Sequence, residues 1–323
     1  MTAAPEIGRA AAGRWELLRS LGAVPDSPAA ARCVGPALGL DPVSAAEHTE
    51  AFVLNCPPYA AIYLGPHGAI GGEGADRVAG FWRAIGITPP AEPDHLAALL
   101  GLYARLGEAA AGARRPAIAA ALAQSQAVLF WEHLWPWLPG YLDAVADLAV
   151  PSLTTWTGLV RRAIAAEYRA KPPCPRQPLA LRAAPPPAEP AAVPEAELAA
   201  VPEAELAAGP EAELAAGPEA EPVAGPRDLV ELVTIPVRSG VILTRRRLAE
   251  GASRAGVGFR IGERRFALRA MLEQDPRATV AWLAGEADRW QQRHRDRAPR
   301  DEVTGWWAAR AARTAQVLRD YTG

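Results

Sequence analysis

Four consecutive eight-residue repeats divide this chain of 323 residues into two parts. They run from Ala191 to Pro222 and read AAVPEAEL, AAVPEAEL, AAGPEAEL and AAGPEAEP. Such a short period cannot form a solenoid unit with a core of its own. The proline in every repeat lacks a backbone donor and disfavours a helical conformation at the preceding residue, so no helix can continue through the repeats. We therefore expect a solvated linker.

The linker extends beyond the repeats. With the proline-rich stretch from Lys171 to Pro190, it covers residues 171–226, and its prolines and like charges favour an extended chain. This division predicts a first domain over residues 1–170 and a second unit over residues 227–323. An acidic sleeve that folds back on the second unit is a less favoured alternative.

Charge differs between the three regions. Residues 191–222 contain eight glutamates and no basic residue, whereas residues 227–323 contain 19 arginines against 12 Asp and Glu residues. Residues 1–190 are close to neutral, with 15 basic and 16 acidic residues. The chain is therefore neutral, then acidic, then basic.

Composition predicts an all-α protein. Leucine and alanine dominate, strand-favouring runs are scarce, and 50% hydrophobic residues suffice for a packed core. The three cysteines, Cys33, Cys56 and Cys174, are widely spaced and predict neither a disulfide framework nor a zinc finger. The N-terminal sequence is not typical of a secretory signal, and no apolar stretch reaches about 18 residues. We expect a cytoplasmic chain without a membrane span.

The first domain reads as a helical bundle. Asp41 is expected to cap the second helix, and Pro93 to occupy the first position of the fourth, with Asp94 in its first turn. In that fourth helix, apolar residues recur at helical spacing and predict one buried stripe: Leu96, Leu99, Leu100, Tyr103 and Leu106. The expected helices cover residues 7–21, 42–54, 76–85, 93–111, 116–134, 138–149 and 152–168.

A loop of different character is expected between Phe52 and Asp76. It contains Pro58, Tyr59 and Tyr63 together with several glycines. Its aromatic side chains need a surface to pack on, and loops of this kind often bind partners. We therefore include this loop in the candidate binding region.

The order of the motifs resembles the TorD family of cytoplasmic chaperones for molybdenum-containing reductases. The motifs are AEHTEAF, CPPYAAIYL, FWRAIGI, PPAEPDHLAALLGLYARL and FWEHLWPWLPGYLDAV, and the similarity covers about residues 10–170. The resemblance implies an all-helical fold that binds a twin-arginine signal peptide or an apoenzyme until the molybdopterin cofactor is inserted. It implies no enzymatic turnover, and we expect neither a cofactor nor a metal in the chain itself.

A peptide groove needs carboxylates for the two arginines and an apolar trough for the residues that follow them. Two histidine motifs, EPDHL at 92–96 and FWEHLWPW at 130–137, offer most of these groups. Glu92, Asp94 and Glu132 are candidates for the first role. The candidates for the second role are Trp82, Phe130, Trp131, Trp135 and Trp137. Core packing, helix capping and buried hydrogen bonding are structural alternatives for these same side chains. The resemblance implies that Tyr59, Tyr63, Asp94, His95, His133 and Trp137 surround this groove. With Pro58, Trp82, Glu132 and Trp135 they make up the predicted peptide-binding or partner-binding set.

Metal-assisted hydrolysis is an alternative use of the two histidine motifs. Asp94, His95, Glu132 and His133 are suitable ligand types. Adjacent side chains on a helix point about 100° apart, so neither pair is arranged to chelate. The chain also lacks HExxH, GxSxG, a P-loop and a dinucleotide fingerprint. A chaperone is therefore favoured over an enzyme.

The second unit is also expected to be helical. Thr244 should cap a helix that extends to about Ala252, and further helices follow, the last over residues 302–321. The unit resembles C-terminal extensions of some actinobacterial members of the same chaperone family. The arginines at 245–247 offer a nucleic-acid-binding regulator as an alternative, but the acids among them favour a solvated face, a dock for an acidic partner or a lid over the first domain.

The expected partners are the apo form of a molybdoenzyme catalytic subunit and its signal peptide, without nucleic acid. The sequence leaves open which molybdoenzyme is the client and whether the chain forms a homodimer.

Overall fold

The structure is a computed structural model that describes residues 3–172, 176–184, 226–297 and 299–321. In these residues the regular structure is entirely helical, which confirms the all-α prediction. The four repeats lie outside the described residues. The chain separates into two compact units. Unit 1 comprises Met1–Arg182, Ile235–Val237 and Ile242–Arg247, and unit 2 comprises Ala183–Thr234, Arg238–Val241 and Leu248–Gly323.

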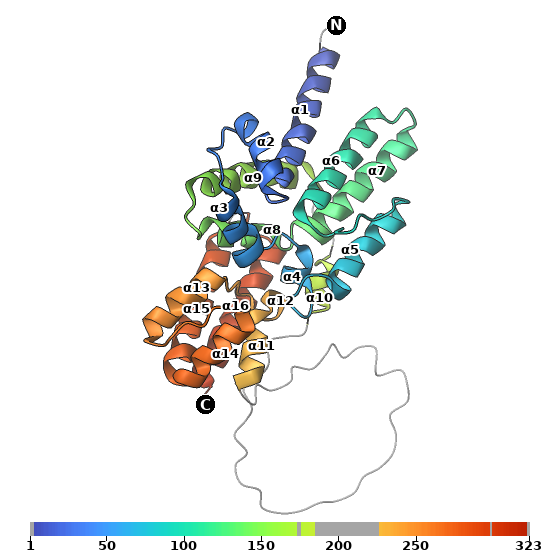
Figure 1. The fold of residues 1–323 in the computed structure, drawn as a ribbon. Helices are drawn as coiled ribbons and strands as arrows, with labels where there is room; N and C mark the ends of the chain where they lie inside the picture. The colour runs from blue at the N-terminus through green and yellow to red at the C-terminus, as the bar shows by residue number, and fades with distance from the viewer. Residues whose placement is uncertain (1–2, 173–175, 185–225, 298, 322–323) are drawn as a thin grey trace, which may run out of the picture. The chain divides into compact units, whose positions relative to one another are not determined.

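Unit 1 contains ten helices and two π-helical turns within its described residues. Helices α6 and α7 lie side by side in Figure 1, and α1 packs along α6. The π-helical turns are η1 (Glu50–Asn55) and η2 (Leu129–Leu134). The helices are α1 (Ala3–Ala23), α2 (Pro28–Leu38), α3 (Ala45–Thr49), α4 (Ala60–Leu64), α5 (Gly72–Ala84), α6 (Leu96–Gly112), α7 (Pro116–Val128), α8 (Leu138–Ala146), α9 (Pro151–Ala170) and α10 (Leu179–Arg182).

The apolar stripe predicted for the fourth helix is confirmed in α6. All five of its side chains are at most 3% exposed: Leu96, Leu99, Leu100, Tyr103 and Leu106. A second part of the core joins distant segments, since the indole N–H of Trp156 donates to the Leu21 carbonyl at 3.0 Å. The core of unit 1 thus combines the α6 stripe, which helical periodicity predicts, with contacts between distant segments, which periodicity cannot predict.

Four predicted helix starts are wrong. Helices α1 and α5 begin about four residues earlier than expected, and two other helices begin later because a different residue caps them. The helix that was expected after Asp41 begins later, and Ser44 caps it through a capping box with Glu47. The helix expected from Pro93 begins at Leu96, because His95 is its N-cap residue. In these two helices a side chain closer to the helix satisfies the first backbone N–H groups.

Two helices within residues 1–170 were not predicted, and a third, α10, lies in the stretch that was expected to be linker. Helix α2 contains an internal proline, but Ser27 caps its start and Gly39 ends it in the left-handed conformation, at φ 66°. Helix α4 lies inside the segment expected to be a loop, and all five of its residues are buried. These helices depend on local capping and burial more than on a long apolar period.

The described part of unit 2 is built largely on the pair α15 and α16, which pack along each other (Figure 1). Thr244 accepts a hydrogen bond from the Arg247 N–H at 3.1 Å, so the predicted cap is confirmed. Helices assigned wholly or partly to unit 2 are α11 (Pro226–Thr234), α12 (Pro236–Ser239), α13 (Arg245–Ala255), α14 (Arg264–Gln274), α15 (Pro276–Asp296) and α16 (Glu302–Asp320). None of the helices described in either unit is long and apolar enough to cross a bilayer.

The segment Ile242–Arg247 belongs to unit 1 although it follows the repeats in sequence. The Arg246 backbone N–H donates to the Asn55 side-chain oxygen at 2.8 Å, and its guanidinium donates to the Leu148 carbonyl at 2.5 Å. Unit 1 is therefore completed by residues that follow the repeats.

Candidate functional site

The two motifs expected to form the binding region meet in a backbone junction. Tyr59 and His95 form an isolated antiparallel bridge. On one side of it the Leu96 N–H donates to the Pro58 carbonyl at 2.8 Å, and on the other the Ala60 N–H donates to the Asp94 carbonyl at 3.0 Å. The CPPY and EPDH segments thus hold each other by main-chain hydrogen bonds, and their relative position is fixed.

The Asp94 side chain is used inside this junction. It is 2% exposed, and its carboxylate accepts the Ala61 N–H at 2.9 Å, in the first turn of α4. Burial raises the pKa of Asp94, and the hydrogen bond from Ala61 opposes this rise. Asp94 therefore positions α4 and offers little surface to a ligand.

His95 has a similar positioning role. Its Nδ1 accepts the Ala97 N–H at 3.2 Å, so the ring caps α6. Its ring also meets the Tyr59 ring edge to face, with centroids 4.9 Å apart. Burial lowers the pKa of His95, which favours the neutral ring that the capping hydrogen bond requires.

An acidic face surrounds Tyr59. The pKa of Tyr59 is raised to about 12, first by burial, then by a hydrogen bond to Glu92 and by the charges of Glu92, Asp94 and Asp26. The side chains of Glu92 and Asp26 are exposed, whereas Tyr59 is half-buried. We define the acidic face as Asp26, Tyr59 and Glu92. Sequence reasoning missed Asp26, since it lies in the turn before α2 and in none of the motifs.

The predicted aromatic set forms a core. Tyr63 and Trp137 are each 1% exposed, and their rings stack with centroids 5.2 Å apart. The Tyr63 hydroxyl donates to the Pro57 carbonyl at 3.0 Å, and the Trp137 indole donates to the His133 carbonyl at 2.8 Å. These side chains hold the CPPY segment against η2 and α8.

The two remaining predicted tryptophans are also buried. Trp82 is 8% exposed and donates to the Pro93 carbonyl at 3.2 Å. Trp135 is 3% exposed and lies 4.6 Å from the Tyr168 ring, centroid to centroid. The structure thus places both indoles in the packing beneath the motifs.

Glu132 differs from these buried residues because it is half-exposed in η2. Its carboxylate accepts the Leu179 backbone N–H at 2.7 Å. The neighbouring Trp131 donates its indole N–H to the Pro172 carbonyl at 3.1 Å. The chain that follows α9 therefore returns to the π-helical turn.

The comparisons with known proteins agree with this region. Residues 42–143 match a family model described as the nitrate reductase delta subunit. Over this segment the chain is similar to nitrate reductase delta subunits. The match confirms the resemblance to TorD-family chaperones and supports a chaperone role in molybdoenzyme maturation, without enzymatic activity. The matched segment contains all ten predicted site residues. A search of curated proteins found no match.

Three of the four residues considered as metal ligands accept hydrogen bonds from different parts of the backbone. Asp94 and His95 accept backbone N–H groups of different helices, and Glu132 accepts that of Leu179. Across the described residues, no three His, Cys, Asp or Glu side chains gather in a group that fits a metal ion.

Because His133 is buried, we expect the free energy of unfolding of unit 1 to fall in acid. This histidine is 7% exposed, and burial with the charge of Arg77 lowers its pKa to about 4. The unfolded chain, with an ordinary histidine pKa of about 6.5, takes up the proton first, so stability falls as the pH falls from about 6.5 to about 4. We expect a loss of about 3 kcal/mol over that range, measured by urea unfolding.

The variant His133→Phe should show a smaller acid loss in unit 1 than the wild type. Replacement of the exposed Ile70 by phenylalanine, which removes no titratable group, is the control and should leave the acid loss unchanged. The same acid loss in both variants would contradict the assignment to His133.

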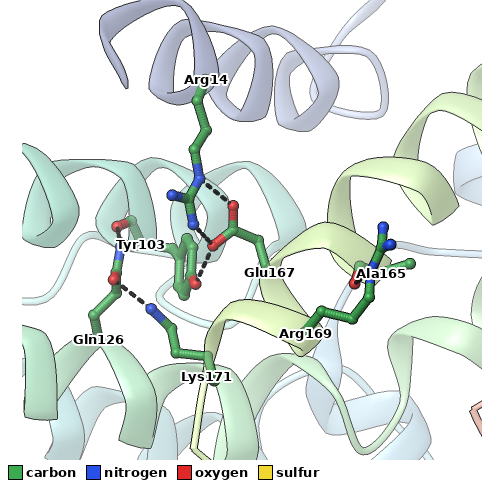
Figure 2. Close-up of polar contacts among 7 residues, drawn as sticks. All are labelled: Arg14, Tyr103, Gln126, Ala165, Glu167, Arg169 and Lys171. Carbon is green, nitrogen blue, oxygen red and sulfur yellow. Dashed lines mark hydrogen bonds and ion pairs between the residues drawn. The ribbon is translucent and has the colours of Figure 1, made fainter. Parts of the chain in front are cut away.

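A buried polar network that joins residues inside and outside the matched segment was missed by sequence reasoning (Figure 2). Glu167, 2% exposed in α9, accepts two hydrogen bonds from the Arg14 guanidinium and one from the Tyr103 hydroxyl, the last at 2.5 Å. Lys171 donates to the Gln126 side chain at 2.6 Å, and Gln126 donates to the Tyr103 carbonyl at 2.9 Å. The network joins α1, α6, α7 and α9 and stabilises the helices that support the candidate site.

Proposed function

We propose that this protein binds the twin-arginine signal peptide of a molybdoenzyme catalytic subunit, and that the acidic face receives the arginines. Binding would precede cofactor insertion and export, and the protein would then act in the cytoplasm. The observation that carries the proposal is that two exposed carboxylates, Asp26 and Glu92, both act through their charge on the half-buried Tyr59.

The chemistry of this face fits a guanidinium group. Carboxylates accept paired hydrogen bonds from arginine, and the face of a tyrosine ring attracts a cation. Each exposed ion pair contributes roughly 0.2–1 kcal/mol and weakens as salt is added. Two acids that bind two arginines together would therefore give a modest, salt-sensitive contribution to affinity.

The backbone junction would keep this face in one conformation before the peptide arrives. Asp94 and His95 hold α4 and α6 in place, while Tyr63 and Trp137 pack beneath them. A site that is already ordered pays less conformational entropy on binding. In this proposal most of the ten predicted residues position the site, and Tyr59 contacts the peptide.

The test is binding of a labelled twin-arginine peptide to the full chain, measured by fluorescence anisotropy. The double variant Asp26→Asn, Glu92→Gln should bind about tenfold more weakly, since two exposed pairs of up to about 1 kcal/mol each are lost. Asp41→Asn removes another exposed carboxylate of unit 1 and serves as the matched control. Unchanged affinity in the double variant, or equal binding of a twin-alanine peptide, would refute the proposal.

Recognition of the folded client is tested separately. The protein should co-purify with its molybdoenzyme less efficiently when the signal peptide of that enzyme is deleted. Equal recovery of both forms would show that the apoenzyme body, and not the signal peptide, is bound.

A further inference from the structure

The chain that follows α9 contacts two consecutive residues of η2. Trp131 donates to the Pro172 carbonyl at 3.1 Å, and Glu132 accepts the Leu179 N–H at 2.7 Å. Both contacts use backbone groups of the returning segment. Any peptide offers a carbonyl and an N–H group, so the same two side chains of η2 can bind a different chain.

The returning segment also buries apolar side chains. We define the strap as residues 176–182, which read RQPLALR. Ala180 is 4% and Leu181 1% exposed, whereas Leu179 is 45% exposed. The strap therefore places a short apolar stretch, which is partly buried, after Arg176 and before Arg182. Its first part, an arginine followed by apolar residues, shares that order with a twin-arginine signal peptide.

We propose that the strap occupies, in the free protein, the surface of η2 that receives the apolar part of the client peptide, and that the client displaces it. This inference rests on the proposed function. It assigns Glu132, which accepts the Leu179 N–H of the strap, to the peptide site and makes the strap an internal competitor for that site.

The strap has the features of a displaceable segment. Its helix α10 has only four residues, which is too short to be stable by itself. It lies at the end of the Met1–Arg182 part of unit 1. A short segment of this kind can open locally while the helices behind it remain folded.

Competition within one chain has a measurable consequence. The apparent dissociation constant of the client equals the intrinsic constant divided by the fraction of protein with an open strap. A substitution that weakens the strap, without touching η2 or the acidic face, should therefore increase the apparent affinity. Most substitutions near a binding site do the opposite, so the direction of the change is diagnostic.

Leu181→Ala is the test variant, because it removes the most deeply buried side chain of the strap. We expect it to bind a twin-arginine peptide with an apolar tail at least about tenfold more tightly than the wild-type full chain. The matched control is Leu179→Ala, the same substitution at an exposed position two residues away. Its affinity should remain close to that of the wild type.

Hydrogen exchange gives a second readout. Exchange of the Leu179 and Leu181 amides should accelerate when the peptide saturates the wild-type protein, because the strap is released. Equal affinity of the wild type and Leu181→Ala, or unchanged exchange with peptide bound, would overturn the strap inference alone. Absence of peptide binding to both proteins would instead refute the proposed function.

Discussion

Replacing Glu167 with glutamine should destabilise unit 1 by about 3 kcal/mol. Its carboxylate accepts three hydrogen bonds from Arg14 and Tyr103 in a site that is 2% exposed. The neutral amide can accept from only part of this set, and its own NH2 group faces donors. The Arg14 side chain is 41% exposed and can turn to water, but Tyr103 and the position of Glu167 are buried. A polar group left there without its hydrogen bond costs roughly 1–3 kcal/mol in lost solvation.

Glu108→Gln is the matched control for this prediction. Glu108 in α6 also pairs with an arginine of α1, Arg19, but both side chains of this pair are substantially exposed, at 42% and 34%. Exposed pairs contribute at most about 1 kcal/mol, so the control should lose much less stability than Glu167→Gln. Urea unfolding of both variants near neutral pH measures the difference. Similar losses would show that the network contributes no more than a surface ion pair.

The Arg14–Glu167 pair illustrates what sequence alone cannot provide. The two residues are 153 positions apart, and neither belongs to a recognisable motif. By contrast, the stripe of α6 and the Thr244 cap follow from local spacing, which is preserved in the fold. Local periodicity therefore predicts the helices, whereas partners from distant helices become apparent only in the tertiary structure.

The candidate site, too, was predicted only in part, because contacts between distant segments decide which of its side chains are exposed. The motifs place the CPPY and EPDH segments in one candidate region, and the Tyr59–His95 bridge joins these two segments in the fold. The sequence does not reveal that the Asp94 carboxylate accepts the Ala61 N–H, or that the charge of Asp26 acts on Tyr59. Whether a polar residue is exposed depends on segments that pack over it, and a single helix pattern contains no such information.

A substitution at Gly240 should affect unit 2 even more strongly. Gly240 has a φ of 72°, a conformation that costs an L-residue about 1 kcal/mol or more. A Cβ atom here would lie 2.4 Å from the Ala311 nitrogen and 2.8 Å from the Trp307 carbonyl oxygen. Both atoms belong to the backbone of α16, so a rotamer change cannot relieve the overlap.

The segment around Gly240 is also tied to the two long helices of unit 2. The Gly240 carbonyl is hydrogen-bonded to the buried His294 ring at 2.9 Å, and the Ser239 carbonyl accepts the Thr314 hydroxyl at 2.8 Å. Moving the segment to admit a methyl group would break these bonds and separate the packed helices. Gly240→Ala should therefore destabilise unit 2 by about 4 kcal/mol, as backbone strain and overpacking combine.

Gly256→Ala separates the two contributions. Gly256 has a similar φ of 70°, but a Cβ atom there would meet no heavy atom within 4 Å. Its replacement should cost only the conformational strain, about 1 kcal/mol. Hydrogen exchange of the α16 amides, measured in both variants, reports the stability of unit 2 directly. A loss in Gly240→Ala no larger than in Gly256→Ala would mean that α16 can move away from this turn, and that the close approach of the two backbones does not contribute to the stability of unit 2.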